Sequence, residues 1–147
     1  MWYVISGAAL WADRVLKRKA RRGQLPESIL HGRIRFQHIE NGGLADSKLR
    51  DKPKAVKCIH TLAYALSVPT LAVFCWHDFA AKCGISLIAA GGGSNLFDRL
   101  RRGTVTDMLQ FPKAPGRIKR LVFNLADFMI ILGSICTAIG LFHQKHP

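Results

Sequence analysis

The sequence predicts an all-α membrane protein, a bundle of four transmembrane helices with a small β-sheet segment after the first helix. Two observations carry this prediction. Of the 147 residues, 49% are hydrophobic, yet 22 lysines and arginines against 9 acids give a formal net charge of +13. Four apolar stretches also approach the roughly 20 residues that cross a bilayer as an α-helix. The length predicts a single domain, residues 1–147.

Composition excludes two other classes of protein. The apolar content excludes a disordered chain. A soluble nucleic-acid-binding protein spreads its basic residues among polar ones, whereas here they flank long apolar runs, so we expect no nucleic-acid partner. The four cysteines lie in or beside apolar runs without C-x-x-C spacing. They therefore predict neither a disulfide framework nor a zinc finger.

Four stretches are expected to form the helices: about residues 1–18, 57–76, 79–100 and 120–143. The second carries no charge after Lys57, and the fourth contains one charge after Arg120, Asp127. The first is apolar only as far as Ala12, and Lys82 with a glycine run interrupts the third. The short connector between the second and third stretches predicts that these two helices run antiparallel.

A polar surface segment, residues 25–56, lies between the first two helices. Residues 33–37 alternate polar and apolar side chains as a half-buried strand does, and residues 40–43 supply turn formers. From Asp13 through Lys57 the chain holds 13 bases against 5 acids, and the loop 99–120 holds seven bases against one acid. By the positive-inside rule, both of these basic loops would be cytoplasmic.

Polar residues at membrane depth are the candidate functional groups, because a carboxylate inside a lipid-embedded helix is costly and tends to mark function. Asn124 and Asp127 share a helical face, which also suits interhelical hydrogen bonds. Asn95, Asp98 and Arg99 share another face, which also suits an interfacial salt bridge with Arg99 reaching lipid phosphate. The spacing of Asp13 and Lys17 at i, i+4 by itself predicts only helix support.

A second carboxylate belongs to Asp107, in a loop otherwise rich in bases. We expect Asp107 and Asp127 to meet where the fourth helix begins. When two carboxyl groups share a site, one pKa is strongly raised and the pair holds one proton. The ionised partner can then take a proton from water while the protonated one polarises a carbonyl, which is the chemistry of peptide-bond hydrolysis.

Five segments in this order resemble the motifs of one family, the lipoprotein signal peptidases (signal peptidase II). These are membrane aspartyl proteases that remove signal peptides from bacterial prolipoproteins. The matching segments are Asp13–Lys17 (D-x-x-x-K), Asn41–Ala45 (N-x-G-x-A), Gly91–Arg99 (G-G-x-x-N-x-x-D-R), Gly103–Asp107 (G-x-V-x-D) and Phe123–Asp127 (F-N-x-A-D).

The resemblance implies an aspartic endopeptidase that cuts just before the diacylglyceryl-modified cysteine of its substrate. It implies three sets of residues: a catalytic pair, Asp107 and Asp127; substrate-binding residues Asn41, Asn95, Arg99 and Asn124; and supporting residues Asp13, Lys17 and Asp98. It implies no metal or cofactor, and it implies a monomer whose partners are a prolipoprotein and membrane lipids. The basic loops would attract anionic lipids among them. Such an enzyme lies in the bacterial plasma (inner) membrane, with its sheet and active site towards the extracytoplasmic face.

Two departures from the family pattern concern the fit of the substrate. Asp46 stands where the family has a phenylalanine, and Ser94 replaces a glycine.

The alternative function is a small four-helix transport or ion-binding protein, in which Asp98, Arg99 and Asp127 would line a proton or ion path. A peptidase needs both Asp107 and Asp127, whereas a conduit tolerates the loss of a loop acid.

Overall fold

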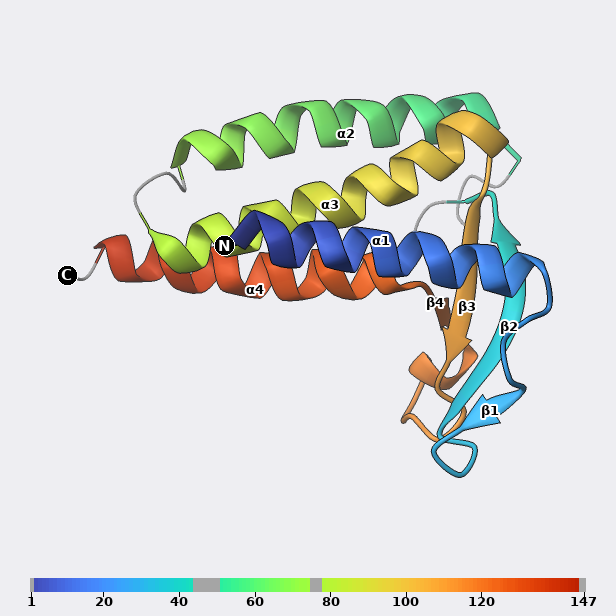
Figure 1. Cartoon of the computed structure of the whole chain (residues 1–147). Helices are drawn as coiled ribbons and strands as arrows, with labels where there is room; N and C mark the ends of the chain where they lie inside the picture. The colour runs from blue at the N-terminus through green and yellow to red at the C-terminus, as the bar shows by residue number, and fades with distance from the viewer. Residues whose placement is uncertain (1, 44–50, 75–77, 146–147) are drawn as a thin grey trace.

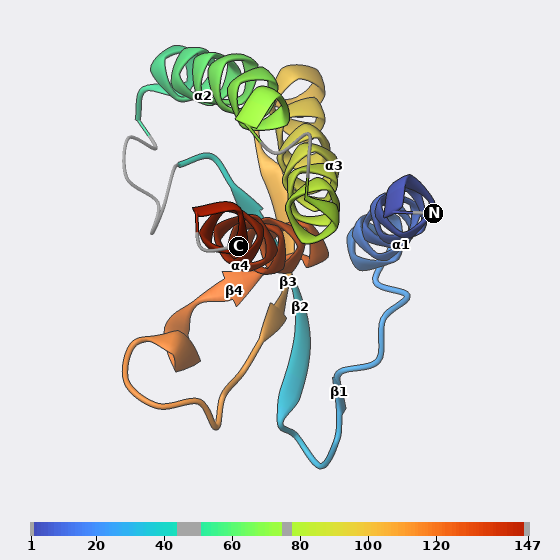
Figure 2. The ribbon, with the colours of Figure 1, turned by 90° about the vertical axis from the view of Figure 1, so that its left-hand side faces the viewer.

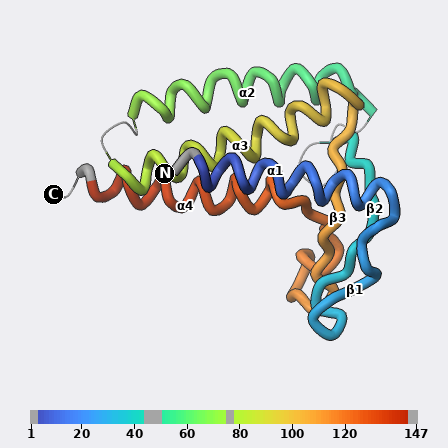
Figure 3. Tube along the Cα trace, in the orientation of Figure 1, coloured from blue at the N-terminus to red at the C-terminus, as the bar shows by residue number. Residues whose placement is uncertain are grey.

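The computed structural model describes residues 2–43, 51–74 and 78–145, and this part of the chain contains four α-helices and a small antiparallel sheet. The helices lie lengthwise beside one another, and the sheet projects from one end of them (Figure 1). The Cα trace in Figure 3 shows that the last helix, Leu125–Lys145, ends away from the sheet. The helices are α1 (Trp2–Arg21), α2 (Pro53–Phe74), α3 (Phe79–Arg102) and α4 (Leu125–Lys145).

The sheet draws its strands from two distant parts of the chain. Its order is β1 (Ser28–Ile29), β2 (Ile34–Asn41), β3 (Val105–Gln110) and β4 (Val122–Phe123), all antiparallel. The strand expected at residues 33–37 is β2, which continues through Asn41, so two of the residues expected in a turn belong to a strand. The loop 99–120, for which its two prolines predict irregular structure, supplies β3 and a short 3₁₀ helix, Ile118–Arg120.

α3 is the central helix and packs against the other three. Viewed along the bundle, α2 and α4 lie on different sides of α3, and α1 covers a third side (Figure 2). The contact between α3 and α4 is close because glycines line it. A Cβ placed on Gly133 would lie 2.6 Å from the carbonyl oxygen of Gly84, so the two backbones approach within a distance that a side chain would prevent.

Two of the described helices are long and apolar enough to cross a membrane, by length and composition. They are Pro53–Phe74, with a mean hydropathy of 1.3, and Leu125–His143, with 2.1. Only 6% of the apolar part of α2 is buried inside the protein, so most of its side chains are not covered by other parts of the chain. Exposed large apolar residues on α2 include Leu62, Leu66 and Val73.

The start of α4 differs from the expected helix at 120–143. Val122 and Phe123 pair with β3, and the helix begins at Leu125. The cause is local: the Asn124 side chain accepts a hydrogen bond of 3.1 Å from the Asp127 backbone N–H, and the Asp127 carboxylate accepts one of 2.9 Å from the Asn124 N–H. This reciprocal pair is a capping box, in which Asn124 is the N-cap residue.

Candidate active site

The two candidate catalytic carboxylates line one cavity of about 500 Å³ at the junction of the sheet and the helices. Asp107 comes from β3, and Asp127 comes from the first turn of α4. Asn124 lies between them: its side-chain amide donates to the Asp107 carboxylate over 2.7 Å, and its backbone N–H donates to Asp127. The capping box that starts α4 therefore also sets the position of one carboxylate relative to the other.

Asn41 holds the second oxygen of Asp107. In the β2–β3 register Asn41 pairs with Val105, so Asp107 is its diagonal neighbour on the same face of the sheet. The Asn41 amide donates to the Asp107 carboxylate over 3.0 Å, and its oxygen accepts a hydrogen bond from the Gly43 N–H. Both oxygens of Asp107 are therefore hydrogen-bonded to asparagine amides.

Asn95, on α3, plays the corresponding part for Asp127. Its amide nitrogen donates to the Asp127 carboxylate over 3.0 Å, and its oxygen accepts a hydrogen bond of 2.8 Å from the Lys17 ammonium. An asparagine has one acceptor and two donors in its amide, and the ammonium fixes which end faces Asp127. Lys17 thus orients Asn95, and Asn95 orients the carboxylate.

Lys17 and its partners form a buried ionic network beneath the cavity. The Lys17 side chain is 1% exposed and forms ion pairs of 2.9 Å with Asp13 and 3.1 Å with Asp98. Asp13 also accepts two hydrogen bonds, one of 2.6 Å from the Ser94 hydroxyl and one of 3.0 Å from the Ala126 backbone N–H at the start of α4. The network therefore joins α1, α3 and α4.

Arg99 holds the end of β2 in place. Its guanidinium donates to the carbonyl oxygens of Gly43 over 2.6 Å and of Asn41 over 3.4 Å. Among the described residues its Nε has no hydrogen-bond partner, although it is buried, and Arg99 lines the same cavity as the two carboxylates. This N–H is available to an acceptor that enters the cavity.

Burial raises the pKa of Asp107 to about 6, against an ordinary value of 3.8. The hydrogen bonds from Asn41 and Asn124 oppose this increase, and the negative charge of Asp127 adds to it. Asp107 therefore keeps a proton at pH values where an exposed aspartate has lost it. A carboxyl pair that retains one proton near neutral pH can act as acid and base together.

The structure brings together all nine residues that the sequence singled out: Asp13, Lys17, Asn41, Asn95, Asp98, Arg99, Asp107, Asn124 and Asp127. The three asparagines, expected to hold substrate, donate their amide hydrogens to the two carboxylates, and a role in holding substrate stays a prediction.

Asp46 lies outside the described residues. Sequence reasoning did not find the contacts of Ser94 or the position of Arg120 in the cavity wall. No pattern in the sequence signals Arg120, whereas Ser94 stood out as a departure from the family motif.

Residues 5–143 match the sequence model of a family described as signal peptidase (SPase) II. The chain belongs to the signal peptidase II family. This membership makes it a membrane enzyme and a peptidase, and the transport alternative is not favoured. The match covers every residue of the site described above.

Curated relatives of this signal peptidase II chain are lipoprotein signal peptidases. One from Solibacter usitatus is 31% identical over 80% of this chain and 73% of its own. One from Enterococcus faecalis is 29% identical over 94% of this chain and 83% of its own. A solved bacterial membrane enzyme with 21% identity superimposes with a TM-score of 0.79 over 99% of this chain and 89% of its own, and so shares the fold.

Proposed function

We propose that this chain is an aspartic endopeptidase that removes the signal peptide from diacylglyceryl-modified bacterial prolipoproteins, cutting just before the lipidated cysteine. Asp107 and Asp127 are the catalytic pair. One observation carries this assignment: both carboxylates line a single cavity, and one asparagine, Asn124, hydrogen-bonds to both of them. The lipoprotein signal peptidases among the relatives supply the substrate class.

The reaction follows from a pair that shares one proton. The ionised carboxylate takes a proton from water as the water oxygen attacks the scissile carbonyl carbon, and the protonated carboxyl donates a hydrogen bond to the carbonyl oxygen. The C–N bond of the tetrahedral intermediate then breaks as a carboxyl proton passes to the amine nitrogen. The products are a signal peptide with a new carboxyl group and a lipoprotein whose lipidated cysteine carries a free amino group.

The other site residues position this pair and the substrate. Asn41, Asn95 and Asn124 hold the carboxylates through the hydrogen bonds given above. Arg99 lines the cavity, and its guanidinium is suited to donate to a backbone carbonyl of the substrate next to the scissile bond. Lys17, with Asp13 and Asp98, acts through Asn95 and the start of α4.

The membrane placement that suits this function has all four helices crossing the bilayer. α2 and α4 meet the criteria of length and composition. α1 and α3 also expose large apolar side chains, among them Ile5, Trp11 and Phe79, which lipid would cover. The sheet and the catalytic cavity then lie at the extracytoplasmic face of the plasma membrane, where a translocated prolipoprotein presents its cysteine. We propose that the enzyme acts as a monomer, because one chain supplies both carboxylates of the pair.

The test is cleavage of a lipidated prolipoprotein by purified protein in detergent. Asp107→Asn and Asp127→Asn each remove one half of the shared-proton mechanism, and each is expected to lower turnover at least about 10³-fold. The matched control is Asp51→Asn, which changes an exposed acid away from the cavity and should keep full activity. Substantial turnover by folded Asp107→Asn protein would refute the catalytic pair.

A further inference from the structure

A second cavity, of about 540 Å³, lies between the ends of α1 and α3 that are nearest the sheet. Six arginines surround it: Arg14, Arg18, Arg21, Arg22, Arg101 and Arg102. Arg14, Arg18 and Arg21 recur at i, i+4 and i+7 on α1, so they share one helical face, and Arg22 follows directly after the helix. Two helices therefore present guanidinium groups to one pocket, which we call the arginine pocket.

Among the described residues, a single acid lines the arginine pocket against its six arginines. Its one acidic lining residue, Asp98, is 3% exposed and already pairs with Lys17 at 3.1 Å. Arg14 and Arg102 lie further from Asp98, at 3.8 and 3.9 Å. Within the described residues, the other four arginines of the pocket form no ion pair: Arg18, Arg21, Arg22 and Arg101. Arg21 donates a hydrogen bond of 2.9 Å to the Thr106 hydroxyl. The cluster of guanidinium groups around this cavity suits a bound anion.

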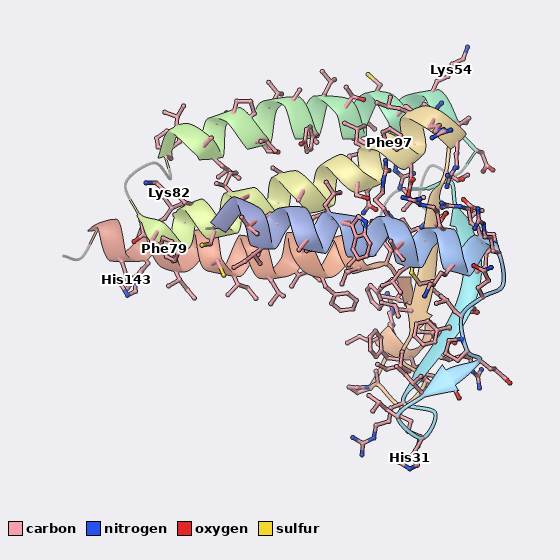
Figure 4. All side chains as sticks on the ribbon, in the orientation of Figure 1. His31, Lys54, Phe79, Lys82, Phe97 and His143 are labelled. Atoms are coloured by element: carbon pink, nitrogen blue, oxygen red, sulfur yellow. The ribbon has the colours of Figure 1, made fainter. Side chains whose placement is uncertain are left out.

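Phe97 gives the pocket an ordered wall. The guanidinium of Arg14 lies 3.8 Å from the centre of the Phe97 ring, and that of Arg101 lies 6.0 Å from it. Such stacking holds a guanidinium plane while its N–H groups stay free to donate. Figure 4 places Phe97 near the end of α3 from which the sheet projects. The geometry suits the bidentate recognition of phosphate oxygens by arginine.

Apolar surface borders the arginine pocket on the same two helices. Trp11 is 67% exposed and lies one turn before Arg14 and two turns before Arg18, and Leu100 is 57% exposed beside Arg101. A basic pocket above exposed apolar side chains matches a phospholipid, whose phosphate lies above its acyl chains. A free phosphate ion would use the arginines and leave the apolar surface uncovered.

We infer that the arginine pocket binds the headgroup phosphate of an anionic phospholipid in the leaflet that borders the sheet. The inference rests on the membrane placement proposed above, and it does not depend on the catalytic pair, which lines the other cavity. A lipid bound there would bridge the ends of α1 and α3. It would also neutralise part of the charge that their arginines concentrate at one membrane surface.

The test measures lipid binding to the whole chain carrying Asp107→Asn, so that its outcome is independent of cleavage. Phosphatidylglycerol and phosphatidylcholine with identical acyl chains are titrated into the purified protein and counted by native mass spectrometry. The triple variant Arg18→Gln/Arg22→Gln/Arg101→Gln is expected to bind phosphatidylglycerol on the order of 100-fold more weakly, given the contribution of each basic residue at an anionic membrane surface. Phosphatidylcholine binding should not change.

The matched control removes the same charge elsewhere. Lys54, Arg117 and Lys119 are exposed and do not line the arginine pocket, and their replacement by glutamine should leave phosphatidylglycerol binding within about twofold of the parent. Equal losses in both triple variants would overturn the inference in favour of diffuse charge attraction. A second outcome would also overturn it: inorganic phosphate raises the unfolding temperature of the parent but not of the pocket variant, and phosphatidylglycerol raises neither. The ligand would then be a soluble anion.

A second variant guards against a folding defect in the triple variant. Phe97→Leu keeps every arginine but removes the ring against which Arg14 and Arg101 lie. Its phosphatidylglycerol binding is expected to weaken several-fold. In the wild-type background, detergent-solubilised triple variant should cleave substrate at the parent's rate when no anionic lipid is present. If the triple variant is inactive, its weak lipid binding could come from misfolding, and the test then rests on Phe97→Leu. Unchanged lipid binding by Phe97→Leu would overturn the inference.

Discussion

The side-chain amide of Asn124 donates to the Asp107 carboxylate over 2.7 Å, and this contact joins the N-cap of α4 to the middle of β3. The capping box fixes Asn124 from the helix side, because Asn124 and Asp127 exchange two further hydrogen bonds. The spacing of the proposed catalytic pair therefore depends on one residue that has no side-chain proton to give or take in the reaction.

Replacement of Asn124 by alanine should lower kcat more than it changes KM. The substitution removes the amide that orients Asp107 and the N-cap oxygen that orients Asp127, and misplacement of catalytic groups by about 1 Å costs on the order of 100-fold in rate. Steady-state kinetics on a lipidated prolipoprotein measure both constants. Gln110→Ala, at the far end of β3, is the control and should match the parent. A change confined to KM would assign Asn124 to substrate binding instead.

Replacement of Lys17 by methionine should destabilise the protein by about 3–5 kcal/mol, the usual effect of breaking a buried ion pair. The reason is that Asp13 and Asp98, 0% and 3% exposed in their side chains, would lose the cation between them. Unfolding in detergent, followed by circular dichroism, measures the loss. Lys19→Met, an exposed position two residues along the same helix, should change stability by less than about 0.5 kcal/mol. Equal effects of the two substitutions would contradict the network.

The pKa of Asp107, raised to about 6, predicts how stability depends on pH. The folded protein holds this proton more tightly than the unfolded chain, whose aspartate has a pKa near 3.8. This contribution to stability is fully present below pH 3.8 and is lost as the pH rises through about 6. Asp107→Asn removes it, so the unfolding temperature of the variant relative to wild type should rise between pH 4 and 6.5. A difference that stays constant over this range would show that Asp107 titrates normally.

The membrane orientation can be tested with single cysteines in a cysteine-free protein. Figure 4 shows His31 at the tip of the sheet and His143 at the other end of the molecule. Ser28→Cys, in the exposed strand β1 near His31, should react with a membrane-impermeant maleimide in intact spheroplasts. His143→Cys, also exposed, should react only after permeabilisation. The reverse pattern would place the catalytic cavity in the cytoplasm and agree with the positive-inside rule.

The local elements could be predicted from the sequence, whereas their long-range partners could not. The apolar runs predicted helices α2 and α4, and the alternation at residues 33–37 predicted part of β2. β3 was missed because two prolines and seven bases dominate the loop 99–120, while its pairing partner lies more than 60 residues earlier. Strand formation there depends on β2, which no local pattern reveals.

The candidate site shows the same limit. The i, i+4 spacing of Asp13 and Lys17 predicted a pair that supports a helix, and the two residues do form that pair. The further contacts of Lys17 with Asn95 and Asp98, about 80 residues away, turn it into part of the site. Spacing along one helix cannot reveal these contacts. For the same reason, spacing along α1 does not reveal that its arginines line one cavity with those of α3.

The hydrogen bond from the Ala126 backbone to Asp13 has a consequence for biosynthesis. Asp13 leaves the ribosome early, while the start of α4 emerges more than 100 residues later. Asp127 and Asn124, which complete the pair and hold Asp107, arrive with that same last segment. If Asp107 and Asp127 are the catalytic pair, as proposed, a nascent chain that lacks α4 has no assembled pair, and proteolytic activity begins only when α4 docks against α1.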